Sequence, residues 1–363
     1  MNKFPIALAG LTPAELEEQL SGLKRFRAVQ IYKWIARGAD DFSEMSDIPL
    51  SLREELKSRF TLFSAQADIC HEEAGAKKIV VSLKDGLKIE AVLLKDGKGR
   101  LTACLSTQAG CPVGCVFCKT GSLGFSRDLD CGEIVEQFLF LRNIAQKERG
   151  QDGAKSGGAH INGAHVIENI VIMGMGEPLL NLENLRKAIA IFSDKTGINF
   201  SKRRITVSTC GVCAGLFDIA ENGPYVRLAL SLVTGDEPLR QKLMPLADAN
   251  PLAKVKEALA IFQKKSGGRV TLEAPLLGGV NTRDKDAQSI AQFAQGLDTV
   301  VNIIPWNPVA GLEFEGSPLR EPDKNEVENF ARLLESSGLK VTMRRRKGRG
   351  VNGACGQLGS LSK

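Results

Sequence analysis

The chain has 363 residues and nine cysteines, and its 48 lysines and arginines exceed its 42 acidic residues, giving a net charge of +6 and an isoelectric point near 8.8. That length predicts a large core and more than one domain. Nine cysteines, with neither a signal peptide nor a membrane span expected, predict reduced thiols, metal chemistry and a cytoplasmic enzyme, while three histidines disfavour histidine-based zinc hydrolysis and a Ser-His-Asp triad.

Residues 1–62 predict a small helical domain. Thr12 and Glu15 have the spacing of a capping box, with a proline at the first helical position. Two further helices are expected near residues 26–35 and 51–60, where apolar side chains recur at helical spacings.

Residues 63–100 are expected to form a hairpin linker between two domains. Two apolar runs, 78–83 and 88–94, flank the sequence Lys-Asp-Gly at 84–86. Alternating apolar runs around a short glycine-containing turn are typical of a β-hairpin.

From residue 101 to about 345, expected strands and helices alternate. The strands are short apolar runs at 101–106, 169–173, 204–208, 226–231, 269–273, 300–304 and 340–343. The helices between them include 131–145, 181–192, 251–264, 284–295 and 323–337. This α/β alternation predicts a parallel sheet with outer helices, and about six units suit an open, partial (β/α)6 barrel. In such barrels, chemistry gathers at the C-terminal ends of the strands.

One stretch inside this region lacks a periodic pattern. Residues 146–166 are rich in glycine, glutamine, alanine and histidine. We expect them to form a flexible surface insertion.

Three cysteines follow the first expected barrel strand. Cys111, Cys115 and Cys118 have the spacing C-x3-C-x2-C, with Phe117 placed to shield one face of a bound group. Three thiolates leave one iron of a four-iron cubane without a protein ligand, so that iron can chelate a substrate. The spacing resembles that of the radical-SAM enzymes, whose open iron binds S-adenosylmethionine.

The alternative for this segment is a structural zinc site. Zinc takes four ligands, usually from two spaced pairs, whereas this segment holds one tight triplet. Cys104 or Cys131 would have to complete such a site, and the sequence leaves that alternative open.

Polar residues lie at the ends of several later strands. Gly176 lets the backbone approach a ligand closely, and Glu177 could accept a hydrogen bond from the ammonium of a bound methionine group. Ser208 and Ser231 end the third and fourth strands, where hydroxyls can contact a ribose or a carboxylate. Asn307 lies in a loop fixed by prolines, which holds its amide rigidly.

The remaining cysteines carry a second pattern. Cys355 lies beside glycines near the C-terminus, which favours an exposed and reactive thiol. Cys104 precedes the triplet by seven residues. Cys210 and Cys213 form a C-x2-C pair that we expect to be buried small residues, with a second metal or redox pair as the alternative.

Positive charge is concentrated in two short runs, 202–204 and 344–349. Such clusters fit a polyanionic partner such as RNA. The alternative is that both are ordinary solvated faces.

Together these segments resemble the radical-SAM adenine-C2 methyltransferases, which modify 23S ribosomal RNA and, in bacteria, certain transfer RNAs. The resemblance extends over nearly the whole chain. Its matching segments are 26–31, 111–118, 124–127, 174–181, 201–204, 304–308 and 354–358.

The resemblance implies a role for particular residues. It implies that Cys111, Cys115 and Cys118 hold a [4Fe-4S] cluster. The implied contacts to S-adenosylmethionine are Gly176, Glu177, Ser208, Ser231, Leu232, Val233 and Asn307. In the C-terminal segment 346–363, Cys355 is implied to carry the methyl group, with Cys104 as its resolving partner and Glu90 as the base.

The implied reaction uses two molecules of S-adenosylmethionine. One methylates Cys355, the second is cleaved reductively, and the methylated base is released when Cys104 forms a disulfide with Cys355. The implied partners are 23S ribosomal RNA or transfer RNA, contacted by the N-terminal domain, and an external electron donor such as a flavodoxin-type protein. The protein itself is expected to be a monomer.

The sequence departs from the family pattern at several places. Val233 stands where the family usually has histidine, and residues 349–353 lack the usual acidic side chains. The C-x2-C pair and the 146–166 stretch are also unusual. A paralogue that acts at C8 or on another target therefore stays open. So does a non-catalytic iron–sulfur RNA-binding protein, although neither cluster nor RNA binding requires both Cys104 and Cys355.

Overall fold

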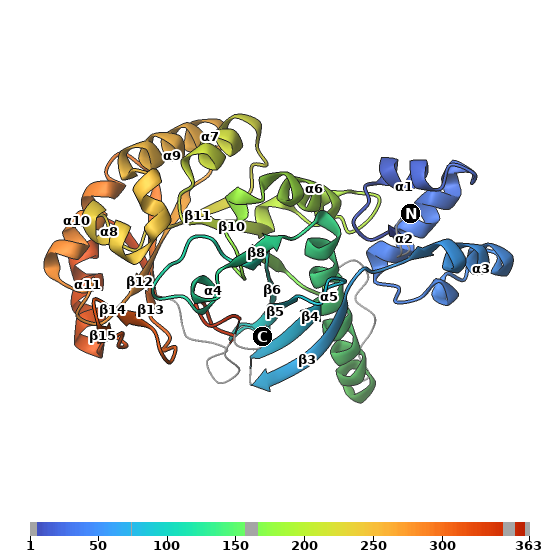
Figure 1. Ribbon diagram of the computed structural model, residues 1–363, viewed down its shortest axis with the longest axis horizontal. Helices are drawn as coiled ribbons and strands as arrows, with labels where there is room; N and C mark the ends of the chain where they lie inside the picture. Colours follow the sequence, from blue (N-terminus) through green and yellow to red (C-terminus); the bar gives the residue numbers. More distant parts are fainter. Residues whose placement is uncertain (1–5, 74, 157–165, 344–352, 360–363) are drawn as a thin grey trace.

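The structure is a computed structural model that describes residues 6–73, 75–156, 166–343 and 353–359. Its main feature is a sheet of ten described strands, curved around a central site, with helices on its outer side (Figure 1). From one edge to the other, the strands are β16 (Lys340–Met343), β13 (Thr299–Pro305), β12 (Val270–Leu276), β11 (Arg227–Ser231), β10 (Ile205–Thr209), β9 (Asn169–Ile172), β6 (Leu101–Leu105), β5 (Lys88–Lys95), β4 (Ala76–Ser82) and β3 (Gln66–Glu73).

The strands from β6 to β16 pair in parallel, and each consecutive pair is joined by a helix. In chain order these helices are α5 (Cys131–Ser156), α6 (Leu182–Ser193), α7 (Cys213–Asn222), α9 (Leu252–Ser266), α10 (Asp284–Ala294) and α11 (Lys324–Ser336). Within the described residues this makes six strand–helix units followed by a last strand. The partial (β/α)6 barrel expected from the sequence is therefore confirmed.

The predicted hairpin is confirmed, and it extends the barrel sheet. β4 and β5 pair antiparallel with each other, and β5 pairs with β6, so the hairpin continues the barrel sheet. β3 adds a further antiparallel strand that the sequence did not indicate. Its sequence, Gln-Ala-Asp-Ile-Cys-His-Glu-Glu, lacks the apolar alternation by which a half-buried strand is recognised.

Two helical predictions are corrected. The stretch from residue 146 begins as helix, because α5 continues to Ser156, while residues 157–165 lie outside the described residues. Lysine, glutamate, glutamine, arginine and alanine are good helix formers, so α5 propagates beyond its apolar part. The sequence also gave no clear indication of α7 or of α8 (Glu237–Leu243), which are short.

The N-terminal part contains α1 (Pro13–Gln19), α2 (Arg25–Arg37) and α3 (Leu50–Arg59), with β1 (Ile6–Ala7) paired to β2 (Phe60–Thr61). The expected capping box is confirmed, since the Thr12 backbone donates to Glu15 and Glu15 N–H donates to the Thr12 hydroxyl. These helices lie beside α5 and α6 (Figure 1).

Polar contacts fix this part against the barrel. Asn143 Nδ2 donates to Gly38 O at 2.9 Å and to Asp40 at 2.8 Å, and Lys187 pairs with Glu15 at 2.7 Å. Gly38 has a φ of +91°, and a Cβ there would lie 2.1 Å from Asn143 Oδ1, so the position requires glycine.

Glu136 in α5 holds the segment that connects the N-terminal helices to the sheet. Its buried carboxyl accepts from Ser64 N–H at 2.7 Å, Ala65 N–H at 2.9 Å and the Ser64 hydroxyl at 3.1 Å. Burial raises the pKa of Glu136 to about 7, while these three hydrogen bonds act in the opposite direction. Desolvation of the charged form therefore outweighs the hydrogen bonds.

Glu136→Gln is expected to lower the free energy of unfolding by about 1–3 kcal/mol at pH 5, because an amide cannot accept from all three donors. The pKa of Glu136 is raised in the folded state, so its contribution to stability is full below about pH 4.5 and is lost as the pH rises through 7. The difference in free energy of unfolding between variant and wild type should thus be smaller at pH 8. Urea titrations at both pH values measure it, and a gap that did not change with pH would contradict the prediction.

Strand pairing places a set of polar residues on one face of the sheet. Cys104 pairs with Val92 of β5 and with Val171 of β9. Residues paired across a ladder point to the same face, as do residues two apart in a strand. Glu90 and Cys104 therefore share the face that carries Ser208, Ser231 and, through its pairing with Ser231, Glu273.

Candidate active site

The cysteine triplet lies in a loop closed by a small strand pair. β7 (Gln108–Gly110) pairs antiparallel with β8 (Phe125–Asp128), and α4 (Lys119–Ser122) follows the last cysteine. Gly110 has a φ of +79°, and a Cβ there would lie 2.0 Å from Gly124 O. Cys111 N–H then donates to that same carbonyl at 2.8 Å, which fixes the start of the loop. The glycine at 110 therefore allows the loop to close.

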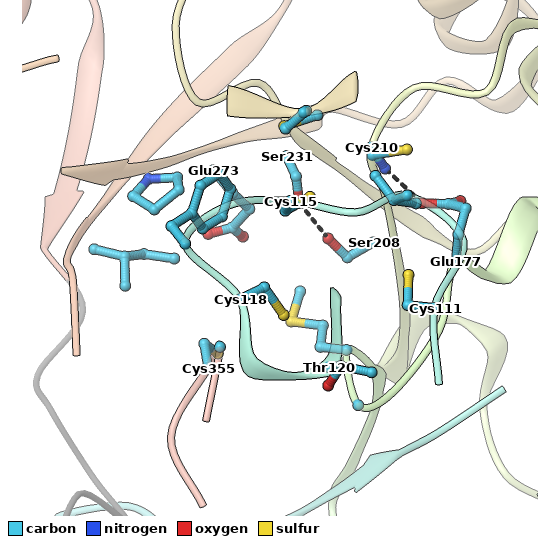
Figure 2. Close-up of a pocket in the computed structure, with 18 of the residues that line it drawn as sticks. Cys111, Cys115, Cys118, Thr120, Glu177, Ser208, Cys210, Ser231, Glu273 and Cys355 are labelled. Atoms are coloured by element: carbon cyan, nitrogen blue, oxygen red, sulfur yellow. Dashed lines mark hydrogen bonds between the residues drawn. The ribbon is translucent and has the colours of Figure 1, made fainter. Parts of the chain in front are cut away.

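The three thiols line one cavity of about 190 Å³ at the C-terminal ends of the barrel strands (Figure 2). Burial raises the pKa of Cys111 to about 12 and also raises the pKa values of Cys115 and Cys118. Buried thiols of this kind release their protons when a metal binds, since the metal replaces the proton as the partner of sulfur.

These donors suit a multi-iron cluster better than a single ion. In the described part of the chain, no three histidine, cysteine, aspartate or glutamate side chains are placed to share one metal ion. Cys104 and Cys131 are buried elsewhere and do not line the cavity, so neither completes a four-ligand zinc site there. Three thiols around a shared cavity fit a [4Fe-4S] cluster with one open iron.

A small hydrophobic cluster surrounds the cysteine loop. Val116 and Phe117 pack against Met244 and Trp306, apart from the main core. Trp306 Nε1 donates to Phe117 O at 2.8 Å, and Val116 N–H donates to Leu243 O at 3.1 Å. This packing shields one side of the site from water, a factor that affects the potential of a bound cluster.

Glu177 lies at the end of β9, buried in the cavity wall. Its carboxylate accepts from Cys210 N–H at 2.7 Å (Figure 2). It also accepts from Leu179 N–H at 3.0 Å and from the Thr209 hydroxyl at 2.7 Å. Burial raises the pKa of Glu177, against the lowering effect of these bonds. Both oxygens thus tie the end of β9 to the end of β10, and contact with a ligand ammonium stays a prediction.

Gly176, directly before Glu177, also lines the cavity. It has a φ of +100°, and a Cβ there would lie 2.6 Å from the Gln108 side chain. Only glycine therefore fits this close approach.

Three other predicted ligand contacts line the same cavity. The hydroxyls of Ser208 and Ser231 lie 3.4 Å apart on neighbouring strands. Asn307 Nδ2 donates to Cys355 O at 3.3 Å, whereas its buried Oδ1 has no hydrogen-bond partner within the described residues. An unpaired buried acceptor in a cavity wall fits a bound ligand that donates a hydrogen bond.

Cys355 also reaches this cavity, although it lies far from the triplet in sequence. Lys119 N–H donates to Gly356 O, and the Thr120 hydroxyl donates to Leu358 O, both at 2.8 Å. Cys355 is half-buried, and so less exposed than the flanking glycines led us to expect, while its reactivity stays a prediction. Hydrogen bonds to α4 hold the segment beside the triplet (Figure 2).

Four predicted residues do not line the cavity. Cys104 is 7% exposed within β6, and Glu90 is fully buried in β5 with its carboxylate 3.2 Å from Lys78 Nζ. Leu232 and Val233 are also fully buried, and their N–H groups both donate to Glu273 O. The structure therefore gathers nine of the thirteen predicted site residues around one cavity and leaves four outside it.

Two residues with ionisable side chains line the cavity although the sequence did not place them there. Glu273 in β12 accepts from Asn302 Nδ2 at 2.7 Å, and its only sequence indication was a carboxylate inside an otherwise apolar strand. Cys210 lines the cavity as well, whereas Cys213 begins α7 and does not. Because the pair is divided in this way, the second metal or redox site loses support.

None of the helices in the described ranges combines the length and the hydropathy that a membrane span requires.

Comparisons with known proteins identify the family of the chain. Residues 6–62 match the ribosomal RNA large subunit methyltransferase N-terminal domain, of the RlmN type. The probable dual-specificity RNA methyltransferase RlmN of Treponema pallidum (strain Nichols) is 44% identical over 357 residues, 98% of each chain. The corresponding protein of Treponema denticola is 45% identical over 363 residues, which is 100% of this chain and 98% of that protein.

A solved structure is similar to this chain in its overall fold. The crystal structure of a radical SAM methyltransferase from Sphaerobacter thermophilus has a TM-score of 0.87 and 35% identity, and the match covers 98% of this chain and 99% of that one. The resemblance found in the sequence and the expectation of an enzyme are confirmed. The chain belongs to the RlmN family of dual-specificity RNA methyltransferases, within the radical-SAM methyltransferases.

Proposed function

We propose that the chain methylates an adenine ring carbon, C2, in 23S ribosomal RNA, transfer RNA or both, through a methylated cysteine and two molecules of S-adenosylmethionine. The observation that supports this most is the position of Cys355, which lines the same cavity as the cysteine triplet. A cluster with an open iron needs only three thiols. A fourth thiol beside them therefore supports a chemical role. RNA is proposed as the substrate because the relatives are named RNA methyltransferases.

Cys111, Cys115 and Cys118 would hold a [4Fe-4S] cluster, which when bound supplies the electron for reductive cleavage of S-adenosylmethionine. Gly176, Glu177, Ser208, Ser231 and Asn307 would contact S-adenosylmethionine, since all five line the cavity. Leu232 and Val233 would act indirectly, because they are buried and their N–H groups are bonded to Glu273 O.

Cys355 would accept the methyl group in the first step. Its thiolate attacks the sulfonium methyl carbon, a new S–C bond forms, and S-adenosylhomocysteine leaves with the electron pair of the broken bond. A cysteine intermediate is required because C2 of adenine is electron-poor and cannot itself attack a sulfonium.

Glu90 and Cys104 would release the product once the carbon carried by Cys355 is bonded to C2. Before that bond forms, the 5′-deoxyadenosyl radical from the second S-adenosylmethionine would take a hydrogen atom from the methyl group carried by Cys355, and the resulting carbon radical would add to C2. The adduct would then lose one electron to an oxidised redox partner, and Glu90 would accept the C2 proton. The Cys104 thiolate attacks the sulfur of Cys355, the carbon keeps the electron pair of the broken C–S bond and takes up a proton, and a disulfide remains. Cys104 does not line the cavity, so this step requires Cys355 and β6 to approach each other.

The partners are proposed on the same basis. The 1–62 region and the exposed run Lys202–Arg204 would contact RNA, while residues 344–349 lie outside the described residues. An external donor of the flavodoxin type would supply electrons, and the protein would act as a monomer in the cytoplasm.

Nucleoside mass spectrometry tests the proposed function. Anaerobically reconstituted enzyme is incubated with S-adenosylmethionine, a reductant and transcripts of 23S RNA or transfer RNA. The expected product is 2-methyladenosine in at least one RNA. 8-Methyladenosine would favour the C8 alternative. No modified nucleoside from enzyme that holds its cluster would favour the non-catalytic alternative.

Replacing Lys202, Arg203 and Arg204 together by alanine should flatten the salt dependence of RNA binding. Each lost phosphate contact lowers the slope of log K against log salt by about 0.7–0.9, so up to about 2–3 units are expected. Filter binding from 50 to 300 mM salt, roughly the range over which counterion release is measured, gives the slope. The matched control replaces Lys254, Lys264 and Lys265, exposed on the outer helix α9. Equal slopes for both triple variants would identify Lys202–Arg204 as a solvated face.

A further inference from the structure

Arg240 is a cation buried directly beneath the cavity. It lies in α8, which begins after β11 where Asp236 accepts from Leu239 N–H at 3.1 Å. Its side chain is fully buried, at 0% exposure. Arginine is rarely buried completely, because its desolvation is costly unless nearby groups compensate the charge. The position therefore requires an explanation.

Only two of the three nitrogens of this guanidinium donate hydrogen bonds to groups in the described residues. Nε donates to Leu232 O at 3.3 Å, and Nη2 donates to Cys210 O. Leu232 and Cys210 directly follow the ends of β11 and β10, so Arg240 links two strand ends at the cavity. Nη1 has no hydrogen-bond partner, and Arg240 has no ion pair, within the described residues.

The helix that carries Arg240 also supports the cysteine loop. Leu243, in the same turn of α8, accepts from Val116 N–H at 3.1 Å, between Cys115 and Cys118. Pro245, just after the helix, lies 3.8 Å from the place of a Cβ on Gly114. The loop and Arg240 are thereby held in a fixed relation.

Four groups that can carry a negative charge lie near Arg240: Cys210 and Cys115 line the cavity, whereas Glu237 and Cys213 do not. Burial, followed by the charges of Cys118, Cys111 and Glu177, raises the pKa of Cys115, and the positive charge of Arg240 acts in the opposite direction. It acts in the same direction on Cys210. The geometry thus places the positive charge of Arg240 against two strand ends that border the cavity, one of them directly before Cys210, which lines it.

We propose that Arg240 tunes the iron–sulfur centre: its charge compensates the cysteine thiolates and raises the reduction potential of the cluster. The proposal rests on the proposed function, in that Cys115 is a cluster ligand. The reduced cluster carries one more negative charge than the oxidised cluster, so a nearby cation in a low dielectric favours reduction. Arg240 is thus a positioning residue that does not touch substrate.

The simpler alternative is that Arg240 only links the ends of β10 and β11. Two substitutions separate charge from hydrogen bonding. Arg240→Lys keeps the charge and loses the planar fork, whereas Arg240→Gln loses both. A matched control is Arg142→Gln. Arg142 also donates to a backbone carbonyl and has two side-chain nitrogens without a hydrogen-bond partner among the described residues, but it lies in α5 against the N-terminal helices.

The test measures iron and sulfide content and the cluster midpoint potential, by redox titration followed with electron paramagnetic resonance, in all four proteins after anaerobic reconstitution. Wild type, R240K and R142Q should share one midpoint. The midpoint potential of R240Q should be more negative by at least about 59 mV, which for one electron is a tenfold change in the reduction equilibrium.

Every outcome decides the proposal. Loss of iron from R240Q but not from R240K also supports charge compensation. Loss of iron from both variants overturns the proposal, and so does a midpoint potential of R240Q equal to that of wild type. A midpoint shift of equal size in R240K and R240Q would assign the effect to the lost fork and also overturn it. Failure of wild-type protein to bind iron would instead contradict the proposed function, which keeps the two failures distinct.

Discussion

Cys115→Ala is expected to remove the iron–sulfur centre completely. Wild-type protein purified without oxygen should be brown and contain about four irons per chain, and the variant should be colourless with less than about one. The triplet supplies three thiolates around one cavity, and a cubane held by two of them loses its anchorage. Iron and sulfide analysis with visible spectroscopy measures the change, and methyl transfer to RNA should fall below detection.

The matched control is Cys213→Ala. Cys213 is a half-buried thiol at the start of α7, outside the cavity, so its removal should leave the iron content unchanged. Stoichiometric zinc without visible absorbance in wild-type protein would contradict the prediction. That result would restore the structural zinc site, with Cys210 or Cys355, which also line the cavity, as the fourth ligand.

Local sequence rules predicted the helices and strands that are stabilised by residues close together in the sequence. The Thr12 capping box needs only Glu15 three residues later. The parallel strands were found because short buried runs of apolar residues alternate with longer helical patterns. β3 was missed because its stability comes from pairing with β4 and not from its own apolar pattern. α5 was ended too early because its last turns contain good helix formers without an apolar face.

The residues of the site divide in the same way, into those that a local pattern predicted and those that depend on tertiary contacts. Cys111, Cys115 and Cys118 are within eight residues, so their spacing alone indicated their chemistry. The approach of Cys355 to them depends on bonds from α4 to the C-terminal segment, which no local pattern encodes. Arg240 was missed because an arginine within a short, charged helix predicts exposure until the neighbouring strand ends are in place.

Val233 shows how a departure from the family pattern is accommodated. It has a φ of +66°, a conformation that β-branched residues rarely adopt, at a cost of about 1–3 kcal/mol. Its carbonyl accepts from Asn281 Nδ2 at 2.9 Å, and its N–H donates to Glu273 O. The backbone turn after β11 is therefore held by its hydrogen bonds, independently of the side chain at 233.

Cys104→Ala and Cys355→Ala are expected to stop the reaction at different stages. Cys355→Ala should give neither methylated protein nor modified RNA, because no thiolate accepts the first methyl group. Cys104→Ala should still give methylated Cys355 and bond it to the base, since Cys104 lies outside the cavity that holds Cys355. Peptide mass spectrometry detects the methylated cysteine, and a denaturing gel detects RNA that migrates with protein.

The retained RNA is the decisive result because it requires every step before release. Without the thiol of Cys104, no group is proposed to attack the sulfur of the adduct, so the covalent RNA complex should persist until the protein is digested. Changing both Cys104 and Cys355 to alanine should abolish the complex, which shows that Cys355 is the point of attachment. Normal turnover by Cys104→Ala would contradict the resolving role. The thiol in question would then be Cys210, which already lines the cavity beside Glu177, and Cys210→Ala would trap the RNA in its place.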